Sequence, residues 1–201
     1  MRPFFTPFKG LGALLILLGF AAASGFFAWE SRPQAATIPF MEKPAMLASG
    51  TGSFPVRLRI PALHVNAPVE DVGLDAQRNM AAPSAWNDVG WYDLGPRPGA
   101  AGNAVIAGHY DSYTGAAVFV SLKKLKPGDD VYVEDAAGMQ HRFRVTRSEL
   151  YQTDAAPMNR IFGPATGAHL NLLTCGGAWD SKHGHYTERL AVFTEAVANG
   201  A

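Results

Sequence analysis

The single cysteine of the chain, Cys175, is the residue whose chemistry is easiest to name. It ends an apolar run that begins at Leu170, and Gly176 and Gly177 follow it. We therefore expect the thiol at the end of a strand, where bare backbone lets a peptide approach closely. A free thiol is mostly protonated at neutral pH, so a nucleophilic role needs a base or a cation nearby. The alternative, a small apolar residue packed in the core, stays open on local context alone.

Two other residues have the chemistry to support a nucleophile. His109 follows the apolar run 104–107 and Gly108, so it also lies at a predicted strand end and offers a general acid and base. Arg189 opens the apolar run 190–193, fourteen residues after the thiol. Its guanidinium would stabilise the oxyanion formed when sulfur attacks a carbonyl, or it would simply be solvated at the rim of a sheet.

The remaining histidines differ in how well their positions suit catalysis. His183 and His185 lie on a predicted loop near Cys175 and stay candidates. His141 and His169 occur in polar, exposed stretches and are interpreted as surface residues. His64 has no feature that favours a role.

These side chains must be positioned by an all-β domain. Short β-rich runs, several with alternating apolar and polar residues, recur between Gly- and Pro-containing turns. The predicted strands are 56–60, 104–107, 131–134, 143–145, 170–175 and 190–193. Only two brief helices are expected, at 117–122 and 154–161. Many short strands of this kind indicate a closed barrel or a sandwich, over residues 55–201.

The first 54 residues predict that the rest of the chain lies outside the cytoplasm. The twenty residues 10–29 carry no charge and are long enough to span a bilayer as a helix. Arg2 and Lys9 precede them, which favours a cytoplasmic N-terminus, so residues 1–30 are interpreted as a membrane anchor. A cleaved signal peptide is the alternative, because Ala21–Ala23 would suit a signal peptidase. Residues 31–54, with three prolines and no apolar period, read as a flexible linker.

Composition excludes several classes of function. Seventeen basic and seventeen acidic residues cancel, so the chain lacks the positive charge of a nucleic-acid binder. One cysteine rules out an intramolecular disulfide framework and a cysteine-rich zinc module. Four acidic residues flank a predicted hairpin, but their spacing matches no defined calcium loop: Asp129, Asp130, Glu134 and Asp135. We expect no metal and no cofactor.

Three dispersed segments together resemble one enzyme family. Val105-Ile106-Ala107-Gly108-His109, Leu172-Leu173-Thr174-Cys175 and an arginine that enters the last strand are similar to the sortases, the membrane-anchored cysteine transpeptidases of bacterial surfaces. The likeness covers nearly all of residues 55–197. Further details resemble the class F branch most closely: Val89-Gly90-Trp91-Tyr92, Asp111-Ser112 after His109, Gly176-Gly177 after the thiol, and Gly184-His185-Tyr186. The usual Thr-Leu-x-Thr-Cys signature departs at its first position, where Asn171 stands.

The resemblance implies a fold, a reaction and an address. It implies an eight-stranded β-barrel with one or two short helices, in which Cys175, His109 and Arg189 meet in a groove. The substrate would be a surface protein with a C-terminal signal similar to Leu-Pro-x-Thr-Gly, cleaved between Thr and Gly through a thioacyl intermediate. The acyl group would pass to an amine of the cell wall or of another surface protein. The enzyme would sit in the bacterial plasma membrane by a single span, with its catalytic domain outside.

Two neighbours of these residues are candidates for a supporting or substrate-binding role. Asp111 lies two residues after His109, so an extended backbone would let it orient the imidazole, although capping its own loop explains it as well. Thr174 precedes the thiol and would act through backbone geometry or its hydroxyl, or would merely pack.

Other functions make different demands on the same residues. A sortase-like hydrolase would use water where a transpeptidase uses an amine, and an anchored, non-catalytic β-barrel binding module would bury Cys175 in its core. The L,D-transpeptidases also use an exported cysteine on a β-rich fold, but their motif has arginine two residues after the thiol, where Gly177 stands here. That class is therefore disfavoured.

Overall fold

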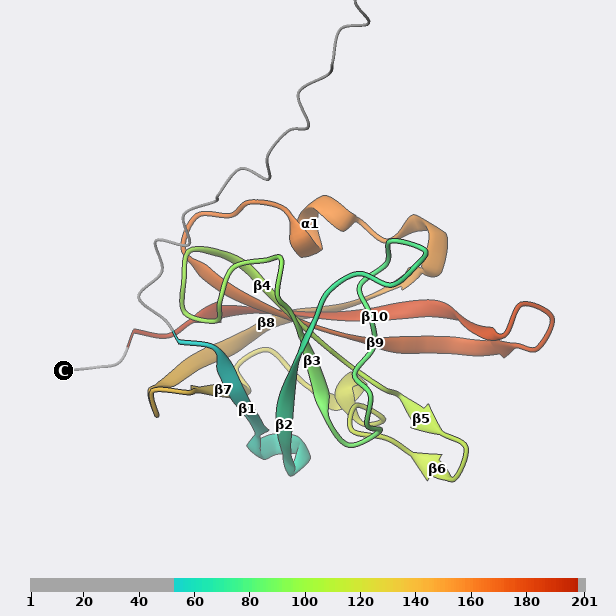
Figure 1. Ribbon diagram of the computed structural model, residues 1–201, viewed down its shortest axis with the longest axis horizontal. Coiled ribbons are helices and arrows are strands. Elements are labelled where there is room, and N and C mark those ends of the chain that lie inside the picture. The colour runs from blue at the N-terminus through green and yellow to red at the C-terminus, as the bar shows by residue number, and fades with distance from the viewer. Residues whose placement is uncertain (1–52, 199–201) are drawn as a thin grey trace, which may run out of the picture. The chain divides into compact units, whose positions relative to one another are not determined.

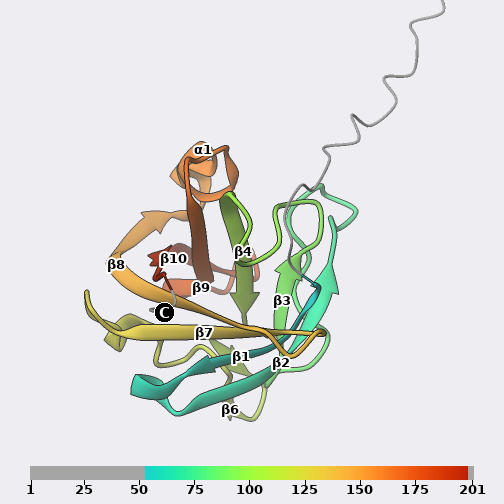
Figure 2. The same cartoon turned by 90° about the vertical axis from the view of Figure 1, so that its left-hand side faces the viewer.

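The computed structural model describes residues 53–198, and eight strands close them into a barrel (Figure 1). Around the barrel the order is β1, β2, β3, β4, β9, β10, β8 and β7, which a second view shows as a ring (Figure 2). The barrel strands are β1 Pro55–Ile60, β2 Val65–Val72, β3 Val89–Tyr92, β4 Gly102–Gly108, β7 Asp130–Asp135, β8 Gln140–Gln152, β9 Ala168–Asp180 and β10 His185–Ala196. The short strands β5 Asp111–Ser112 and β6 Gly115–Ala116 pair in a separate hairpin. The expected eight-stranded all-β barrel is confirmed.

The barrel interior is filled by apolar side chains that alternate with polar ones along the strands, as the sequence pattern predicts. In β1, Leu58 and Ile60 are fully buried, and Leu58 pairs with Val133 of β7, which is equally buried. Burying an aliphatic side chain of this size stabilises the fold by roughly 1.5–3 kcal/mol before the entropy of ordering it is subtracted. The largest side chains of this core come from other strands of the ring and from the segment between β6 and β7: Trp91, Ile106, Phe119, Leu122, Phe143, Leu170 and Leu172.

The strands β4 and β9 run parallel and are covered on both faces. Their register pairs Ala104 with Leu170 and Ile106 with Leu172, which point inward. The outer face carries a second apolar cluster, in which Val105 packs with Ile161 of the short helix α1, Met158–Phe162. A strand buried on both faces reads as a continuous apolar run, which explains the sequence of β4.

Both expected helices differ from the structure. Residues 117–122 form successive turns rather than a helix, with i to i+3 hydrogen bonds, and only a 3₁₀ helix, η2 Leu122–Lys124, follows. Segment 154–161 is split into the 3₁₀ helix η3 Thr153–Ala155 and α1. Pro157 separates them because it has no N–H group and disfavours a helical residue before it. A third 3₁₀ helix, η1 Pro61–Leu63, joins β1 to β2.

Sequence patterning missed β2, which contains a proline and several polar residues. Pro68 pairs with Arg57 of β1, whereas the pairing of β2 with β3 begins only at Val69. Pro68 therefore needs no backbone donor on its β3 side, which is where a proline is tolerated in a sheet.

The expected anchor, residues 10–29, and nearly all of the linker lie outside the described residues. Ser53 and Phe54, assigned above to the end of the linker, contact the barrel: Ser53 N donates to Asp135 Oδ2 at 3.3 Å, and the Phe54 ring lies 6.1 Å from that of Trp91. Within residues 53–198, no helix has the length and apolarity needed to cross a bilayer.

Candidate active site

Three neighbouring strands bring the three candidate catalytic residues into one row. The β10–β9 register pairs Arg189 directly with Cys175. On the other side of β9, the last β4 pair joins Ala107 to Leu173, and continuing this register two residues places His109 beside Cys175. The Thr174 hydroxyl supports the continuation, since its Oγ1 donates to the Gly108 carbonyl at 2.8 Å. Arg189 is thus paired with Cys175 on one side of β9, and on the other side His109 directly follows the end of β4.

The row lies on the outer wall of the barrel. In β9, Leu172 and Thr174 are buried toward the interior, whereas Leu173 and Cys175 alternate with them on the outer face. Cys175 is half-buried, as are His109 and Arg189. The thiol is therefore not an interior core residue. The expectation that it ends a strand is wrong, because β9 continues through both glycines to Asp180.

Burial sets the protonation of the thiol. It raises the pKa of Cys175 above the ordinary value for cysteine, because the protein around the sulfur disfavours the charged form. The Arg189 guanidinium lowers this pKa and the Asp111 carboxylate raises it, without reversing the net direction. At neutral pH the resting thiol is protonated, so it must transfer its proton to a base in order to attack.

Arg189 is held through one of its nitrogens. Nη1 donates to the carbonyls of Glu188 at 2.9 Å and Tyr186 at 3.0 Å, and to Thr153 Oγ1 of η3 at 3.1 Å. A guanidinium has five N–H groups, of which Nη1 carries two. The three on Nε and Nη2 take no part in these contacts, so the group is anchored at one corner and keeps donors for a substrate oxygen.

His109 is fixed by the segment between β2 and β3. Its Nε2 lies 2.9 Å from the Pro83 carbonyl oxygen, and its ring centroid is 4.4 Å from that of Trp86. A carbonyl oxygen only accepts hydrogen bonds, so Nε2 carries a hydrogen. Nδ1 is then the nitrogen that takes up and releases a proton.

Asp111 is bonded to a tyrosine. Its Oδ2 accepts a hydrogen bond from the Tyr186 hydroxyl of β10, and this contact raises the pKa of Tyr186 to about 12. The Asp111 carboxylate thereby ties the β5–β6 hairpin to β10 and places a negative charge near the thiol. The hydrogen bond of His109 goes instead to Pro83.

The other candidate histidines do not join the row. His183 and His185 lie at the tip of the β9–β10 hairpin, where Asp180 pairs with His185 and contacts His183 Nδ1 at 2.6 Å. Five residues of strand separate this tip from Cys175, about 17 Å, so the expectation that they lie near the thiol is wrong. His169 contacts the Thr166 carbonyl.

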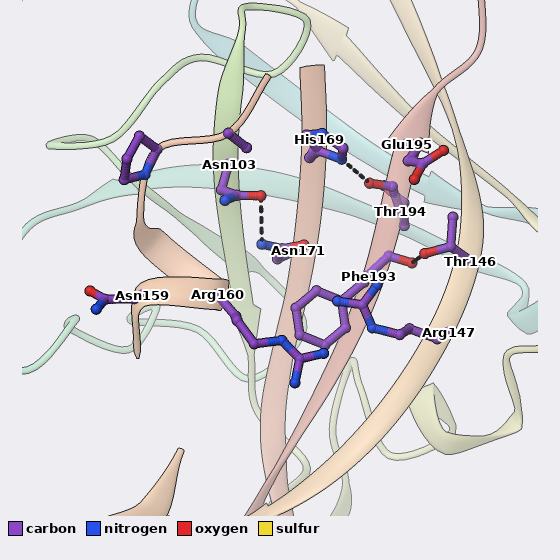
Figure 3. Close-up of a pocket in the computed structure, with 12 residues that line it drawn as sticks. Asn103, Thr146, Arg147, Asn159, Arg160, His169, Asn171, Phe193, Thr194 and Glu195 are labelled. Carbon is purple, nitrogen blue, oxygen red and sulfur yellow. Dashed lines mark hydrogen bonds between the residues drawn. The ribbon is translucent and has the colours of Figure 1, made fainter. Parts of the chain in front are cut away.

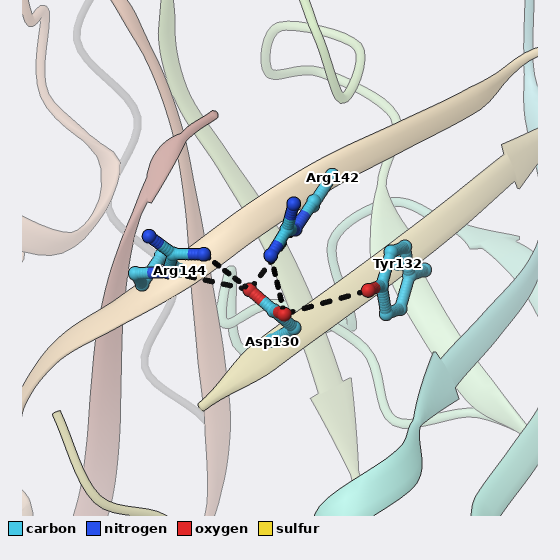
Figure 4. A network of polar contacts seen from close by, with 4 residues as sticks. All are labelled: Asp130, Tyr132, Arg142 and Arg144. Atoms are coloured by element: carbon cyan, nitrogen blue, oxygen red, sulfur yellow. Dashed lines mark hydrogen bonds and ion pairs between the residues drawn. The ribbon is translucent and has the colours of Figure 1, made fainter. Parts of the chain in front are cut away.

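Two of the four acidic residues at the β7–β8 hairpin, Asp130 and Asp135, accept hydrogen bonds from donors of β8. Asp130 accepts from Arg142 at 2.7 Å and Arg144 at 3.3 Å (Figure 4). Asp135 accepts from His141 and from the amides of the turn that follows it. Over residues 53–198, no group of three or more His, Cys, Asp or Glu side chains could hold a metal ion.

A separate hollow of about 290 Å³ lies further along the outer face (Figure 3). Asn171, which stands in place of the signature threonine, is buried there; its Nδ2 donates to the Ile161 carbonyl at 2.8 Å and to Asn103 Oδ1 at 3.2 Å. Asn103 in turn donates to the Gly163 carbonyl at 2.8 Å. The two amides therefore fasten the C-terminal end of α1 to β4 and β9. The side chains that line the hollow include Arg147, Arg160, His169, Phe193 and Thr194.

Several side chains at the site were not found from the sequence. Trp86 contacts His109 and is 40% exposed, whereas Trp91 is buried in the core. Thr153, which fixes Arg189, and Glu70, which holds the segment under His109, carry no local signal. Their contacts depend on segments brought together only by folding.

Comparisons with known proteins agree with this geometry. The sortase domain family matches residues 58–197. Similar solved structures include sortase A of Corynebacterium diphtheriae, as a lid mutant (TM-score 0.58, 20% identity, 75% of this chain and 74% of that one), and sortase C-1 of Actinomyces oris (0.54, 24%, 70% and 72%). Sortase C1 of Streptococcus suis is another (0.57, 18%, 74% and 75%). No curated protein matches the chain.

At these identities the solved structures show a common fold, while the family match extends over well over half of the sequence. The family and the fold thus point the same way, and the chain belongs to the sortase family of cysteine transpeptidases.

Proposed function

We propose that this sortase cleaves a sorting signal similar to Leu-Pro-x-Thr-Gly between Thr and Gly, and transfers the acyl group to a cell-surface amine. The strand register supports the proposal, because it pairs Arg189 with Cys175 and brings the end of β4, which His109 follows, to the other side of β9. The half-buried sulfur is open to a peptide, and the two flanking groups supply the acid–base and electrostatic functions that acyl transfer needs.

In the first half-reaction the Cys175 proton moves to Nδ1 of His109, and the thiolate attacks the threonine carbonyl. The N–H groups on Nε and Nη2 of Arg189 stabilise the oxyanion. As the tetrahedral intermediate collapses, the His109 imidazolium protonates the nitrogen of the departing glycine, and a thioester remains on Cys175. Because the pKa of Cys175 is raised, the thiolate–imidazolium pair is a minor form of the resting enzyme.

In the second half-reaction an amine enters where glycine left. Neutral His109 takes a proton from the amine as it attacks the thioester, and the Cys175 thiol is released with a new amide bond formed. Thr174 supports both steps by holding the end of β4, which fixes the backbone beside His109. Asp111 supports them by fastening the β5–β6 hairpin to Tyr186. The chemistry requires no cofactor.

We further propose that residues 10–29 anchor the chain in the bacterial plasma membrane with the N-terminus in the cytoplasm. The uncharged run and the preceding basic residues support this orientation, and residues 31–54 then separate the catalytic domain from the outer surface. The motifs around His109 and Cys175 favour class F. The partners would be surface proteins that carry a sorting signal, together with an amine of the cell wall or of a second surface protein.

The function is tested by incubating the full-length chain with a fluorogenic library of Leu-Pro-x-Thr-Gly peptides, with and without a primary amine, followed by mass spectrometry. We expect a thioester on Cys175 and a product joined to the amine. Cys175→Ala should abolish turnover. His109→Ala should do so nearly as completely, whereas His183→Ala, at the hairpin tip, serves as the matched control and should not.

Other outcomes separate the alternative functions. Product formed only with water, even at high amine concentration, would identify a sortase-like hydrolase. No turnover, together with a Cys175 thiol that reacts slowly with a methanethiosulfonate reagent and at the same rate in His109→Ala, would contradict the enzymatic proposal and favour a binding module.

A further inference from the structure

The segment that follows β2 contacts the imidazole of His109 at two points. The Pro83 carbonyl accepts the hydrogen bond from Nε2 at 2.9 Å, and the Trp86 ring packs against the imidazole with centroids 4.4 Å apart. These contacts set both the direction of Nε2 and the plane of the ring. The position of segment 83–86 therefore determines where Nδ1 points.

Two exposed residues, Ser84 and Ala85, connect Pro83 to Trp86, and a single carboxylate holds them. Ser84 N donates to Glu70 Oε2 at 2.9 Å and to Oε1 at 3.1 Å, and Ser84 Oγ donates to Oε1 at 3.0 Å. Ala85 N also donates to Oε1, at 3.2 Å. Hydrogen bonds to an ionised acceptor are stronger than neutral ones, so this side chain clamps the short link.

The backbone hydrogen bonds of the segment lie at its far end. Val118 N donates to the Trp86 carbonyl at 3.1 Å, and Asp88 N donates to the Ala85 carbonyl at 3.2 Å. Neither contact fixes Pro83, whose ring nitrogen has no hydrogen to donate. Pro83 is buried by packing, and Glu70, which is paired with Gly90 of β3, supplies the hydrogen bonds that tie the link between Pro83 and Trp86 to the barrel.

We infer that Glu70 is a positioning residue for catalysis, which holds segment 83–86 so that Pro83 and Trp86 keep the His109 imidazole aligned with Cys175. This inference rests on the proposed function for its kinetic consequence. The structural part of the inference, that the Glu70 carboxylate fixes the position of the His109 imidazole, does not depend on any particular substrate.

The electrostatics agree with this arrangement. The pKa of Glu70 is lowered, first by the Ser84 amide and to a smaller extent by the positive charge of His109. The carboxylate is thus ionised at neutral pH, and it is near enough to the imidazole to feel its charge.

The test compares Glu70→Ala, Glu70→Gln and Ser84→Ala in the full-length chain. Asp71→Asn is the matched control, because Asp71 is the next residue of β2, is exposed, and loses the same charge from the opposite face. We expect kcat to fall about tenfold to a hundredfold in Glu70→Ala, with KM changed by less than about twofold, since misplacing a catalytic group affects the chemical steps. The kcat of Glu70→Gln, which keeps one acceptor oxygen, should fall less, and the kcat of Ser84→Ala should fall least.

A second readout is independent of turnover. In a ¹⁵N-histidine-labelled chain, the Nε2–H signal of His109, assigned by its loss in His109→Ala, should be sharp in the wild type and in Asp71→Asn. It should shift or broaden in Glu70→Gln and disappear through exchange in Glu70→Ala. Thermal unfolding checks that each variant is folded, and if Glu70→Ala is not, Glu70→Gln and Ser84→Ala decide.

An unchanged Nε2–H signal in folded Glu70 variants would overturn the inference, as would an equal loss of kcat in Asp71→Asn. A wild-type chain inactive on every peptide would count against the proposed function, while the Nε2–H signal would still decide whether Glu70 positions His109.

Discussion

Residues 168–175 form the part of β9 that lies beside β4 and His109, and the two ends of the outer face of this part treat their polar groups differently. At one end the Asn171 amide is 1% exposed, and its Nδ2 is committed to Asn103 and to the Ile161 carbonyl. At the other end Cys175 is half-buried, and its neighbours Arg189 and His109 are each held through a single nitrogen. In the first arrangement the polar atoms make hydrogen bonds that hold the structure together. The second fixes the position of each group and leaves atoms free to react.

This difference explains why the departure from the family signature falls where it does. Asn171 lies four residues before Cys175 on the same face of the strand, and its amide serves to fasten α1 to the barrel. A threonine hydroxyl at this position is shorter, so it cannot reach both acceptors. The substitution changes how the helix is anchored and leaves the row around the thiol intact.

Among variants that keep both the thiol and the imidazole, removal of the guanidinium should have the largest effect. Arg189→Ala is expected to lower kcat/KM about 10²- to 10³-fold, the usual loss for an oxyanion donor, while unfolding free energy falls by only about 1 kcal/mol. Because Arg189 lowers the pKa of Cys175, the midpoint of thiol alkylation against pH should move upward. Peptide kinetics, alkylation rates and urea unfolding measure these three quantities.

The matched control for this change is Arg147→Ala, since Arg147 stacks on Phe193 at the other end of the outer face. Equal losses of activity in the two variants would mean that the two ends do not differ as described. Arg189→Lys should recover little, because an ammonium lacks the planar fork of donors.

The opposite pattern is expected at the other end. Asn171→Ala should lower the free energy of unfolding by about 1–3 kcal/mol, because it leaves the buried Asn103 amide and the Ile161 carbonyl short of a partner. The kcat should stay close to that of the wild type. Asn171→Thr should cost less stability, since a hydroxyl can still satisfy one acceptor. Loss of activity with unchanged urea unfolding would contradict the structural role.

Thr174 lies between the two ends and should show a smaller, mixed effect. Thr174→Val keeps the shape but removes the donor to the Gly108 carbonyl, which should cost about 1 kcal/mol of unfolding free energy. A several-fold loss of kcat should accompany it, at most about tenfold, because the end of β4 carries His109. Thr174→Ser restores the hydroxyl and should recover the activity. An inactive Thr174→Ser variant would show that the hydroxyl is not what matters.

The barrel was largely predictable because the strands that line its interior alternate apolar and polar residues in the sequence. All six predicted strands exist, as parts of β1, β4, β7, β8, β9 and β10. Their lengths were not predictable, since β9 and β10 continue beyond the core as a hairpin whose residues are exposed or half-buried and keep no apolar pattern. Because no apolar pattern follows Cys175, the sequence wrongly predicts that the strand ends there.

The residues that we propose to react stand out in the sequence, whereas the residues that hold them do not. Cys175, His109 and Arg189 each border an apolar run, so the sequence marks them. Glu70 binds a segment fourteen residues away, and Thr153 meets Arg189 across thirty-six. Contacts of this kind depend on strand order and register, which no local pattern encodes.

Asp111 should have the smallest effect on the thiol, because its charge contributes less to the pKa of Cys175 than burial or Arg189 does. Asp111→Asn removes a negative charge near the sulfur, so the midpoint of thiol alkylation should move downward, opposite to the change in Arg189→Ala. The pKa of Tyr186, now about 12, should also fall toward its ordinary value.

The change in the alkylation midpoint of Cys175 and the change in the pKa of Tyr186 both follow from the loss of one carboxylate. The pKa of Tyr186 is measured from tyrosinate absorbance against pH. Since the folded pKa of Tyr186 is raised, its contribution to stability is present below the ordinary tyrosine pKa and is lost as pH rises toward 12. Asp111→Asn should therefore flatten the alkaline part of the stability profile, whereas Asp180→Asn, at the hairpin tip, should not. If the alkylation midpoint stayed in place while the Tyr186 pKa fell, Asp111 would act only as a fastening between the hairpin and β10, and the charge around the thiol would be set by Arg189 and burial alone.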